Sequence, residues 1–372
     1  MAGNSPPPTR EQILDGPAMR APSDITPDFQ HPWSMFYHAI RILISVYVLS
    51  TVVVLVRMYA QLRIVRKFFM EDYVIILAWL VHTAAFMPVG VQLDYAPMGV
   101  HQWDITVRQF EHYLFYQYVG FIVWIILTLL LKIAILLQYL RIFVPDGTRG
   151  FTFWASHIVL WANLTYYIAY TFIFLFVCSP RPFFWDKTIP NGKCLNIFGI
   201  NVIGAAFCLA SDLIILLLPQ RVIFQLTLTR RRKISLALLF AIGIFACMTS
   251  AVRLYYNIRL WKNQSDVTYQ LGFISLWGTA QLAAGFWIVC SPSIPKTFNY
   301  LRGKPWACRI ETELRSRLRS SSPKSDVQQI PTIGGAGRRR DGAGRLVSDV
   351  EFHDLVNKTE RSDVSRADSG AV

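Results

Sequence analysis

The chain has 372 residues, of which 53% are apolar and only 16% are charged, whereas about 25% of an ordinary soluble domain is charged. This composition excludes an intrinsically disordered protein, a coiled coil and a small disulfide-rich scaffold, and it disfavours a soluble globule because a water-facing surface needs more charge. The formal net charge is nevertheless +14, which indicates apolar membrane spans flanked by basic loops or tails.

The first 35 residues are polar and include the run Pro6–Pro8. They contain no apolar core of the kind found in a cleavable signal peptide, so we expect the first span to act as an uncleaved insertion signal. We expect residues 1–35 to form a disordered tail on the outer side of the membrane.

Seven apolar runs follow, each near the length of about 20 residues that a helix needs to cross a bilayer. A soluble protein could not bury so many helices that lack a polar face. The runs predict an all-α membrane protein in which residues 36–295 form a seven-helix bundle. The predicted spans are Ile40–Val56, Tyr73–Leu93, Val119–Tyr139, Trp154–Val177, Ile197–Leu218, Ile234–Tyr255 and Leu271–Ser291.

Lysine and arginine in the loops predict the orientation of this bundle, because cytoplasmic loops carry an excess of both residues. Eleven of them fall in the three short loops on one side, against eight in the longer segments on the other side. We therefore expect the N-terminus outside and the C-terminus in the cytosol.

Two features of the predicted outer loops concern covalent modification. Cys178 and Cys194 flank one of these loops, where a disulfide would persist, although two free thiols near the membrane edge would fit the same placement. Asn263 begins an Asn-Gln-Ser glycosylation acceptor in another, which makes the chain a candidate glycoprotein.

The composition changes again at the end of the seventh span. Residues 296–345 carry 12 Lys and Arg but only 4 Asp and Glu, and hydrophobic residues are sparse. This composition predicts that residues 296–372 form a basic, largely disordered cytosolic tail. Within it, Phe298–Leu318 would form an amphipathic helix on anionic lipids or stay solvated beside the membrane. The Arg338–Arg340 run does not indicate nucleic-acid binding, because the tail is tethered to a membrane.

Four charged residues lie within predicted spans: Lys132, Asp212, Arg253 and, at the outer end of the first span, Arg41. Such residues usually face the interior of a bundle, or else extend a long side chain toward the membrane interface. The second alternative is open to Lys132 and Arg253, but Asp212 is too short for it. We therefore hypothesise a Lys132–Asp212 pair that forms a structural or switching link between the third and fifth spans.

No arrangement of residues indicates catalysis or metal binding. The sequence contains no HExxH, CxxC, Walker or GxGxxG pattern, and its seven histidines are scattered along the chain. We therefore expect neither enzymatic activity nor a bound metal or cofactor.

Several motifs occur in a fixed order between about residues 36 and 300: Gly99-Val-His101-Gln-Trp103-Asp104, Lys132 to Phe143, Phe176-Val-Cys178-Ser-Pro180, Gly192-Lys-Cys194, Asp212 with Pro219, and Asp266-Val-Thr268. This order resembles the fungal rhodopsin-domain integral membrane proteins of the satratoxin-cluster type, which are themselves similar in layout to G-protein-coupled receptors. One departure is Gln281, four residues after Trp277, where the family usually has Glu. Glutamine still forms hydrogen bonds, so we group Gln281 with Lys132, Asp212 and Arg253 in one intramembrane polar network.

The resemblance implies a receptor-like or accessory membrane protein, and members of the family occur in fungal secondary-metabolite gene clusters. It would place a small-molecule pocket near the outer face, with His101, Trp103 and Trp185 at its rim. These three residues could equally be interfacial anchors, because Trp prefers the membrane–water interface. The alternative functions are a small-molecule transporter or exporter and, with less support, an intramembrane enzyme.

The family name does not imply light sensing. A retinal Schiff base needs a lysine in the seventh span, and Leu271–Ser291 contains none. The third span ends in Tyr139-Leu-Arg141 rather than a Glu/Asp-Arg-Tyr triplet, so coupling to a G protein rests on analogy of layout alone. Lipids are the partners that the sequence itself indicates.

Overall fold

A computed structural model of the chain describes residues 9–22, 26–29, 36–95, 99–143, 150–220 and 230–302, and the structural statements below concern these residues. The chain divides into two units, residues 1–308 and 309–372, and the second lies wholly outside the described residues. The predicted cytosolic tail beyond residue 302, with most of the helix expected at Phe298–Leu318, lies outside them as well.

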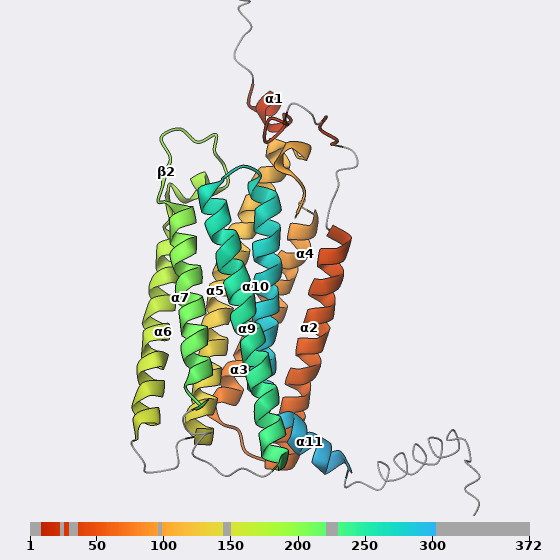
Figure 1. Ribbon diagram of the computed structural model, residues 1–372. Coiled ribbons are helices and arrows are strands. Elements are labelled where there is room, and N and C mark those ends of the chain that lie inside the picture. Colours follow the sequence, from red (N-terminus) through yellow and green to blue (C-terminus); the bar gives the residue numbers. More distant parts are fainter. Residues whose placement is uncertain are drawn as a thin grey trace, which may run out of the picture. The chain divides into compact units, whose positions relative to one another are not determined.

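The first four spans are helical over their whole length (Figure 1). A short α1 (Arg10–Leu14) precedes the first span, α2 (Phe36–Tyr59), which continues into a π-helical turn, η1 (Ala60–Val65). The second span consists of α3 (Met70–Val81), the π-helical turn η2 (His82–Phe86) and α4 (Met87–Tyr95). A 3-10 turn, η3 (Gln102–Asp104), leads to the third and fourth spans, α5 (Val107–Phe143) and α6 (Phe151–Leu175).

The remaining spans follow a small hairpin. Strands β1 (Cys178–Ser179) and β2 (Lys193–Cys194) pair antiparallel, with the 3-10 turn η4 (Arg181–Phe184) between them. The last three spans are α7 (Ile197–Leu217), α9 (Arg230–Lys262) and α10 (Val267–Cys290), and the helix α11 (Ser293–Arg302) comes next. We call the end of the bundle that carries β1 and β2 the hairpin end, and the opposite end the α11 end (Figure 1).

Seven helices of the described residues are long and apolar enough to cross a membrane, which confirms the predicted seven-helix fold. Large apolar side chains are exposed on the outside of these helices, for example Val52, Ile158 and Ile203. In water such a surface would drive aggregation, whereas lipid tails solvate it and the helices satisfy their own backbone groups. The chain is therefore a multi-pass membrane protein.

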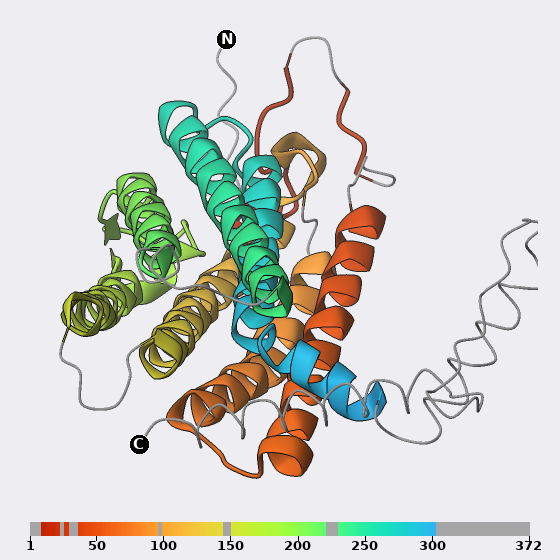
Figure 2. The same ribbon diagram turned by 60° about the horizontal axis from the view of Figure 1, so that its bottom comes forward.

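The centre of the bundle is formed by α5 and α10. In their most apolar windows, 56% of the α5 residues and 67% of the α10 residues are buried, against a third or less in the other spans. In Figure 2, α10 lies between α9, α5 and α2. Glycine allows this close packing: a Cβ atom at Gly278 would lie 3.2 Å from the Trp124 indole nitrogen of α5.

The third span is much longer than its apolar run predicted. The run covers Val119–Tyr139, whereas α5 has 37 residues and therefore a length of about 55 Å. Its added first turns include Arg108 and Glu111, and so extend past the apolar zone at the hairpin end. There the Phe115 ring packs against Trp185 of the hairpin loop, with 5.2 Å between ring centres.

Part of the N-terminal segment is ordered against the start of α5. The backbone N–H of Ala18 donates to the Ile105 carbonyl at 2.9 Å, and that of Val107 donates to the Gly16 carbonyl at 3.0 Å. Together with α1, these contacts give residues 10–18 a defined structure that the polar composition of residues 1–35 did not indicate.

Candidate functional site

Lys132 of α5 and Asp212 of α7 form an ion pair between the helices, with 2.6 Å between Nζ and Oδ1. The two side chains are only 5% and 12% exposed. The Lys132 ammonium also donates to the Ser211 hydroxyl and, at 3.2 Å, to the Cys208 carbonyl. The structure thus brings together the two charges that sequence reasoning paired, and surrounds the lysine with acceptors.

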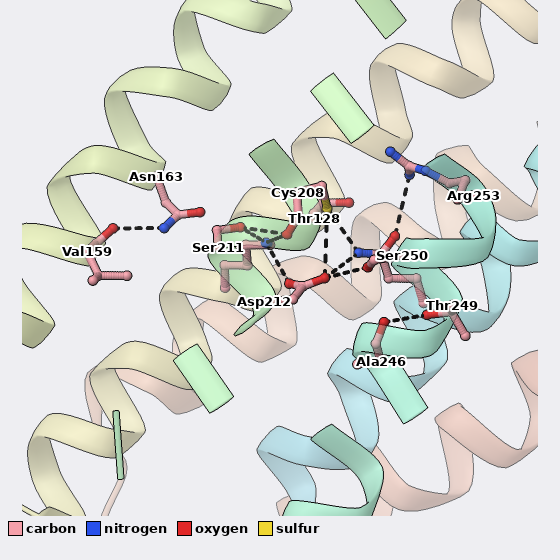
Figure 3. A network of polar contacts seen from close by, with 12 residues as sticks. Thr128, Val159, Asn163, Cys208, Ser211, Asp212, Ala246, Thr249, Ser250 and Arg253 are labelled. Carbon is pink, nitrogen blue, oxygen red and sulfur yellow. Dashed lines mark hydrogen bonds and ion pairs between the residues drawn. The ribbon is translucent and has the colours of Figure 1, made fainter. Parts of the chain in front are cut away.

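The second carboxylate oxygen of Asp212 connects two further helices (Figure 3). It accepts hydrogen bonds from the Ser250 hydroxyl of α9 at 2.5 Å and from the Gln281 amide of α10 at 2.9 Å. One carboxylate therefore links α5, α7, α9 and α10. Because the Gln281 side chain donates to Asp212, an ionised Glu at this position would instead place two carboxylates in contact.

Arg253 lies one helical turn beyond Ser250, toward the hairpin end. Its side chain is buried, and its guanidinium carbon lies 3.7 Å from the centre of the Trp124 ring. The contact from Nη1 to the Gln281 carbonyl oxygen is long, at 3.4 Å. Figure 3 shows one guanidinium nitrogen turned toward the network and another turned away from it.

Helical spacing explains how separate segments of sequence assemble this network. Ser250 and Arg253 are three positions apart on α9, so they lie on one face of that helix. Ser211 and Asp212 are neighbours on α7, and both of their side chains reach Lys132. Gln281 belongs to the most buried helix. Polar groups exposed to hydrocarbon are costly unless they are paired, which favours turning all of these faces inward.

A cavity with a volume of about 220 Å³ lies beneath the hairpin, near the network. Side chains of α5, α6, α7, α9 and α10 line it, and most of them are aromatic or aliphatic. Polar groups enter the wall at four positions only: Gln117, Lys187, Asn201 and Asn257. An apolar wall with a few polar groups is the usual composition of a small-molecule site.

A smaller cavity, of about 70 Å³, lies between α2, α4, α5 and α10, and Arg253 of α9 contributes to its wall. The two cavities share Gln117, Phe121 and Ile274. The network also has a neighbouring cavity of about 50 Å³, lined in part by Lys132 and Asp212. Cavities and polar network thus form one contiguous region of the bundle.

The residues predicted to form a pocket rim lie elsewhere. His101 is stacked between the rings of Trp103 and Tyr269, at 4.4 and 4.6 Å, and its Nδ1 lies 2.5 Å from an oxygen of Asp266. This group joins the first loop of the hairpin end to the start of α10. Trp185 packs on α5 next to the lining residue Phe184. None of the three predicted rim residues lines the cavities described above.

The modification sites of the sequence analysis lie at the hairpin end. Cys178 and Cys194 face each other in the strand pair and are joined by a disulfide. Asn263 is exposed between α9 and α10, and its side-chain oxygen accepts hydrogen bonds from the backbone and hydroxyl of Ser265. Glycosylation of this residue stays a prediction.

Sequence reasoning missed a second buried cluster of charges, which lies at the α11 end. Arg57 is 1% exposed, and its guanidinium lies 2.7 Å from Asp72 and 2.7 Å from the side-chain oxygen of Gln138. Glu71 pairs with Arg141 at 2.6 Å. These residues had been counted as loop charges, because apolar runs locate helix ends only to within a few residues. The signal that could have found them is an acidic doublet that opens one span beside an arginine that ends the previous one.

A membrane-spanning bundle of seven apolar helices, with charged residues buried between them, defines a seven-helix integral membrane protein. The chain belongs to the fungal rhodopsin domain family, whose sequence model matches residues 56–300. This confirms the family that the motifs indicated.

Individual relatives differ in what their names describe. The chain is 30% identical to the Fugralins biosynthesis cluster protein 2 of Gibberella zeae, over 76% of this chain and 71% of that protein. It is 32% identical to a SAT4 family membrane protein of Emericella nidulans, over 66% of this chain and 61% of the relative. It is 24% identical to the Receptor GIN3 of Arthrobotrys oligospora, over 62% of this chain and 57% of the relative. No solved structure matches the chain.

Proposed function

We propose that this protein is a non-enzymatic, receptor-like membrane protein that binds a small, mostly apolar molecule in the cavity beneath the hairpin. The observation that carries the proposal is the continuity between that cavity and the buried ion pair. Asn257 lines the cavity and its amide donates to the Arg253 carbonyl at 2.8 Å. Arg253 contacts Gln281, and Gln281 in turn donates to Asp212.

These contacts couple a ligand in the cavity to the ion pair, and through the pair to the other helices of the bundle. The Lys132–Asp212 pair links four helices, and a buried pair has a narrow range of favourable geometries because each charge would be costly alone. A ligand that moves α9 or α10 would change the free energy of that pair, and so the relative stability of two helix arrangements. This is the property that a receptor needs.

Cavity size and the nature of Asp212 favour binding over catalysis. The volume of about 220 Å³ exceeds that of an engineered cavity of about 150 Å³ that binds benzene, and lies below the range of about 300–1,000 Å³ for drug-sized ligands. The ligand would therefore be a compact, one- or two-ring or short-chain molecule. Asp212, the acidic residue within the network, is already occupied by Lys132, Ser250 and Gln281.

The proposal includes the orientation and surroundings of the bundle. The hairpin end faces the outside or a lumen, where its disulfide persists and Asn263 is accessible to glycosylation, and the α11 end faces the cytosol. The protein carries no retinal, since its seventh span has no lysine. The names of the relatives support two settings, the membrane of a secondary-metabolite producer and a sensory membrane.

Molecules that co-purify with the protein test this proposal. Leu271 lines the cavity, so Leu271→Trp should fill it, whereas Ile173→Trp adds the same indole on the exposed surface of α6. Wild type and Ile173→Trp, purified from fungal membranes, should carry at least one small molecule, seen by mass spectrometry of solvent extracts, that Leu271→Trp lacks. Identical extracts from all three proteins would contradict the proposal. The transport alternative predicts that the identified molecule crosses the membrane of proteoliposomes faster than that of protein-free liposomes, whereas a receptor leaves the rate unchanged.

A further inference from the structure

The buried centre of the bundle carries more positive than negative charge. Lys132 and Arg253 are both 4% exposed, whereas Asp212 pairs with Lys132 and is linked to Arg253 only through Gln281. Asp212 lies against Lys132, and among the described side chains no acidic group forms an ion pair with Arg253. The other buried carboxylates of the described chain, Glu71 and Asp72, are engaged at the α11 end.

An arginine in this situation is costly unless a counter-charge is supplied. A guanidinium presents five N–H donors in a planar fork and keeps its charge in any protein environment. Arg253 directs one donor to Gln281 over a long distance and stacks on Trp124, which is a weaker stabilisation than a full ion pair. Arg253 also contributes to the wall of the cavity of about 70 Å³, which makes it the charged residue of that wall.

The rest of that cavity has the character of a site for an apolar body. Its wall is mostly aliphatic and aromatic side chains, and its polar contributors besides Arg253 are Gln117, Ser275 and Thr279. Three of its residues also line the larger cavity beneath the hairpin. A single buried cation in an apolar wall matches a molecule with one anionic head and an apolar remainder.

We propose that the ligand of this protein is a small apolar carboxylate, whose head group binds the Arg253 guanidinium in the smaller cavity. This rests on the proposed function and names the chemical class of its ligand. A carboxylate is planar and accepts two parallel N–H bonds from one guanidinium, and it is small enough for a volume of about 70 Å³. Its binding neutralises the excess charge beside the Lys132–Asp212 pair.

Binding would also act on the network directly. The carboxylate competes with the Gln281 oxygen for Arg253, and Gln281 is a donor to Asp212. A ligand that draws the guanidinium toward the cavity thus loosens one hydrogen-bonding connection between α9 and α10. The ligand class and the switching role of the ion pair are linked through this one side chain.

The test compares acids with their neutral analogues on purified protein in lipid nanodiscs. Linear carboxylates from butanoate to decanoate, each paired with its primary amide, are assayed by the shift that they cause in thermal unfolding. At least one acid should stabilise wild type more than its amide does. Arg253→Gln should lower the affinity for that acid by at least ~10-fold, because the variant loses a hydrogen bond to a charged group. The matched control is Arg259→Gln, an exposed arginine on the same helix, which should bind as wild type does.

Two further variants keep the test informative if Arg253→Gln folds poorly. Arg253→Lys keeps the positive charge but loses the planar pair of N–H donors. It should still prefer the acid to the amide, but bind the acid more weakly than wild type does. Gly90→Leu adds bulk to the wall of the smaller cavity, on α4 rather than on the arginine's own helix, with its Cβ 3.2 Å from Leu43, and should abolish acid binding. Correct folding of each variant is checked by gel filtration.

The outcomes separate the two proposals. Amides that stabilise as well as acids, an acid preference that survives in Arg253→Gln, or no stabilisation by any acid would each overturn the carboxylate inference. If wild type still carries a co-purifying neutral molecule that Leu271→Trp lacks, the proposed function stands without that inference. If co-purification also fails, both fall.

Discussion

Removing the two members of the Lys132–Asp212 pair should have unequal effects. Lys132→Met leaves Asp212 connected through Gln281 to a second buried cation, Arg253. Asp212→Asn instead leaves two buried cations with no carboxylate between them. The loss of one partner of a buried pair costs about 3–5 kcal/mol, so we expect about 3 kcal/mol for Lys132→Met and about 5 kcal/mol for Asp212→Asn.

The variant with both substitutions, Lys132→Met and Asp212→Asn, shows whether the two side chains stabilise the protein as a pair or independently. With both charges of the pair removed, the net charge beside Arg253 returns to its wild-type value, and the loss should fall to about 2 kcal/mol. A free-energy change of 1 kcal/mol shifts the unfolding temperature by about 2–4 °C for a bundle of this size. Asp212→Asn should therefore lower it by about 10–20 °C, and adding Lys132→Met should recover most of that shift.

The assay is thermal unfolding of detergent-solubilised protein, followed by intrinsic fluorescence, with surface expression measured in parallel. Arg108→Met is the control, because it removes one member of an exposed pair with Asp15 and should cost well under 1 kcal/mol. Strictly additive losses in the double variant would refute the pairing. Equal losses in the two single variants would refute the argument from excess positive charge.

Three further predictions concern the ends of the bundle. Arg57→Ala should lower the free energy of unfolding by about 3–5 kcal/mol, because it leaves the buried Asp72 without its cation. Arg63→Ala, at an exposed arginine, should lower it by less than about 0.5 kcal/mol. Equal effects of the two variants in thermal unfolding would show that the cluster is dispensable. Cys178→Ser should lower stability by about 3 kcal/mol, as expected for a closed loop of about 15 residues, and wild type treated with reductant should match it; a variant as stable as oxidised wild type would contradict this. Asn263→Gln should lower the apparent mass on an electrophoresis gel by that of one glycan. If glycosidase treatment leaves the mobility of wild type unchanged, Asn263 is not glycosylated.

The sequence predicted the features that depend on patterns along one chain segment. Apolar runs located all seven spans, and the cost of a charge in hydrocarbon singled out Lys132 and Asp212, which the structure places in contact. Asp212 was the stronger signal because its short side chain cannot reach the interface.

Features that depend on packing between segments were not predictable in this way. The buried Arg57–Asp72 pair spans the junction of two helices, where apolar runs give no sharp boundary. The first turns of α5 are polar enough to be read as a loop, yet they stay helical because the hairpin packs against them. The cavity beneath the hairpin is a space between side chains of five helices. His101 and Trp103, which the sequence offered as pocket-rim residues or interfacial anchors, stack on each other and do not line that cavity.

The most direct test of the account is to map where a small apolar acid binds. Purified protein in nanodiscs is labelled with a diazirine derivative of hexanoic acid, and the modified peptides are located by mass spectrometry. Labelling should concentrate on the cavity-lining parts of α5 and α10, near Phe121 and Ile274, and should fall on addition of excess hexanoate or in Arg253→Gln. Labelling confined to the exposed faces of α2 and α6, and unaffected by competitor, would contradict a ligand site inside the bundle.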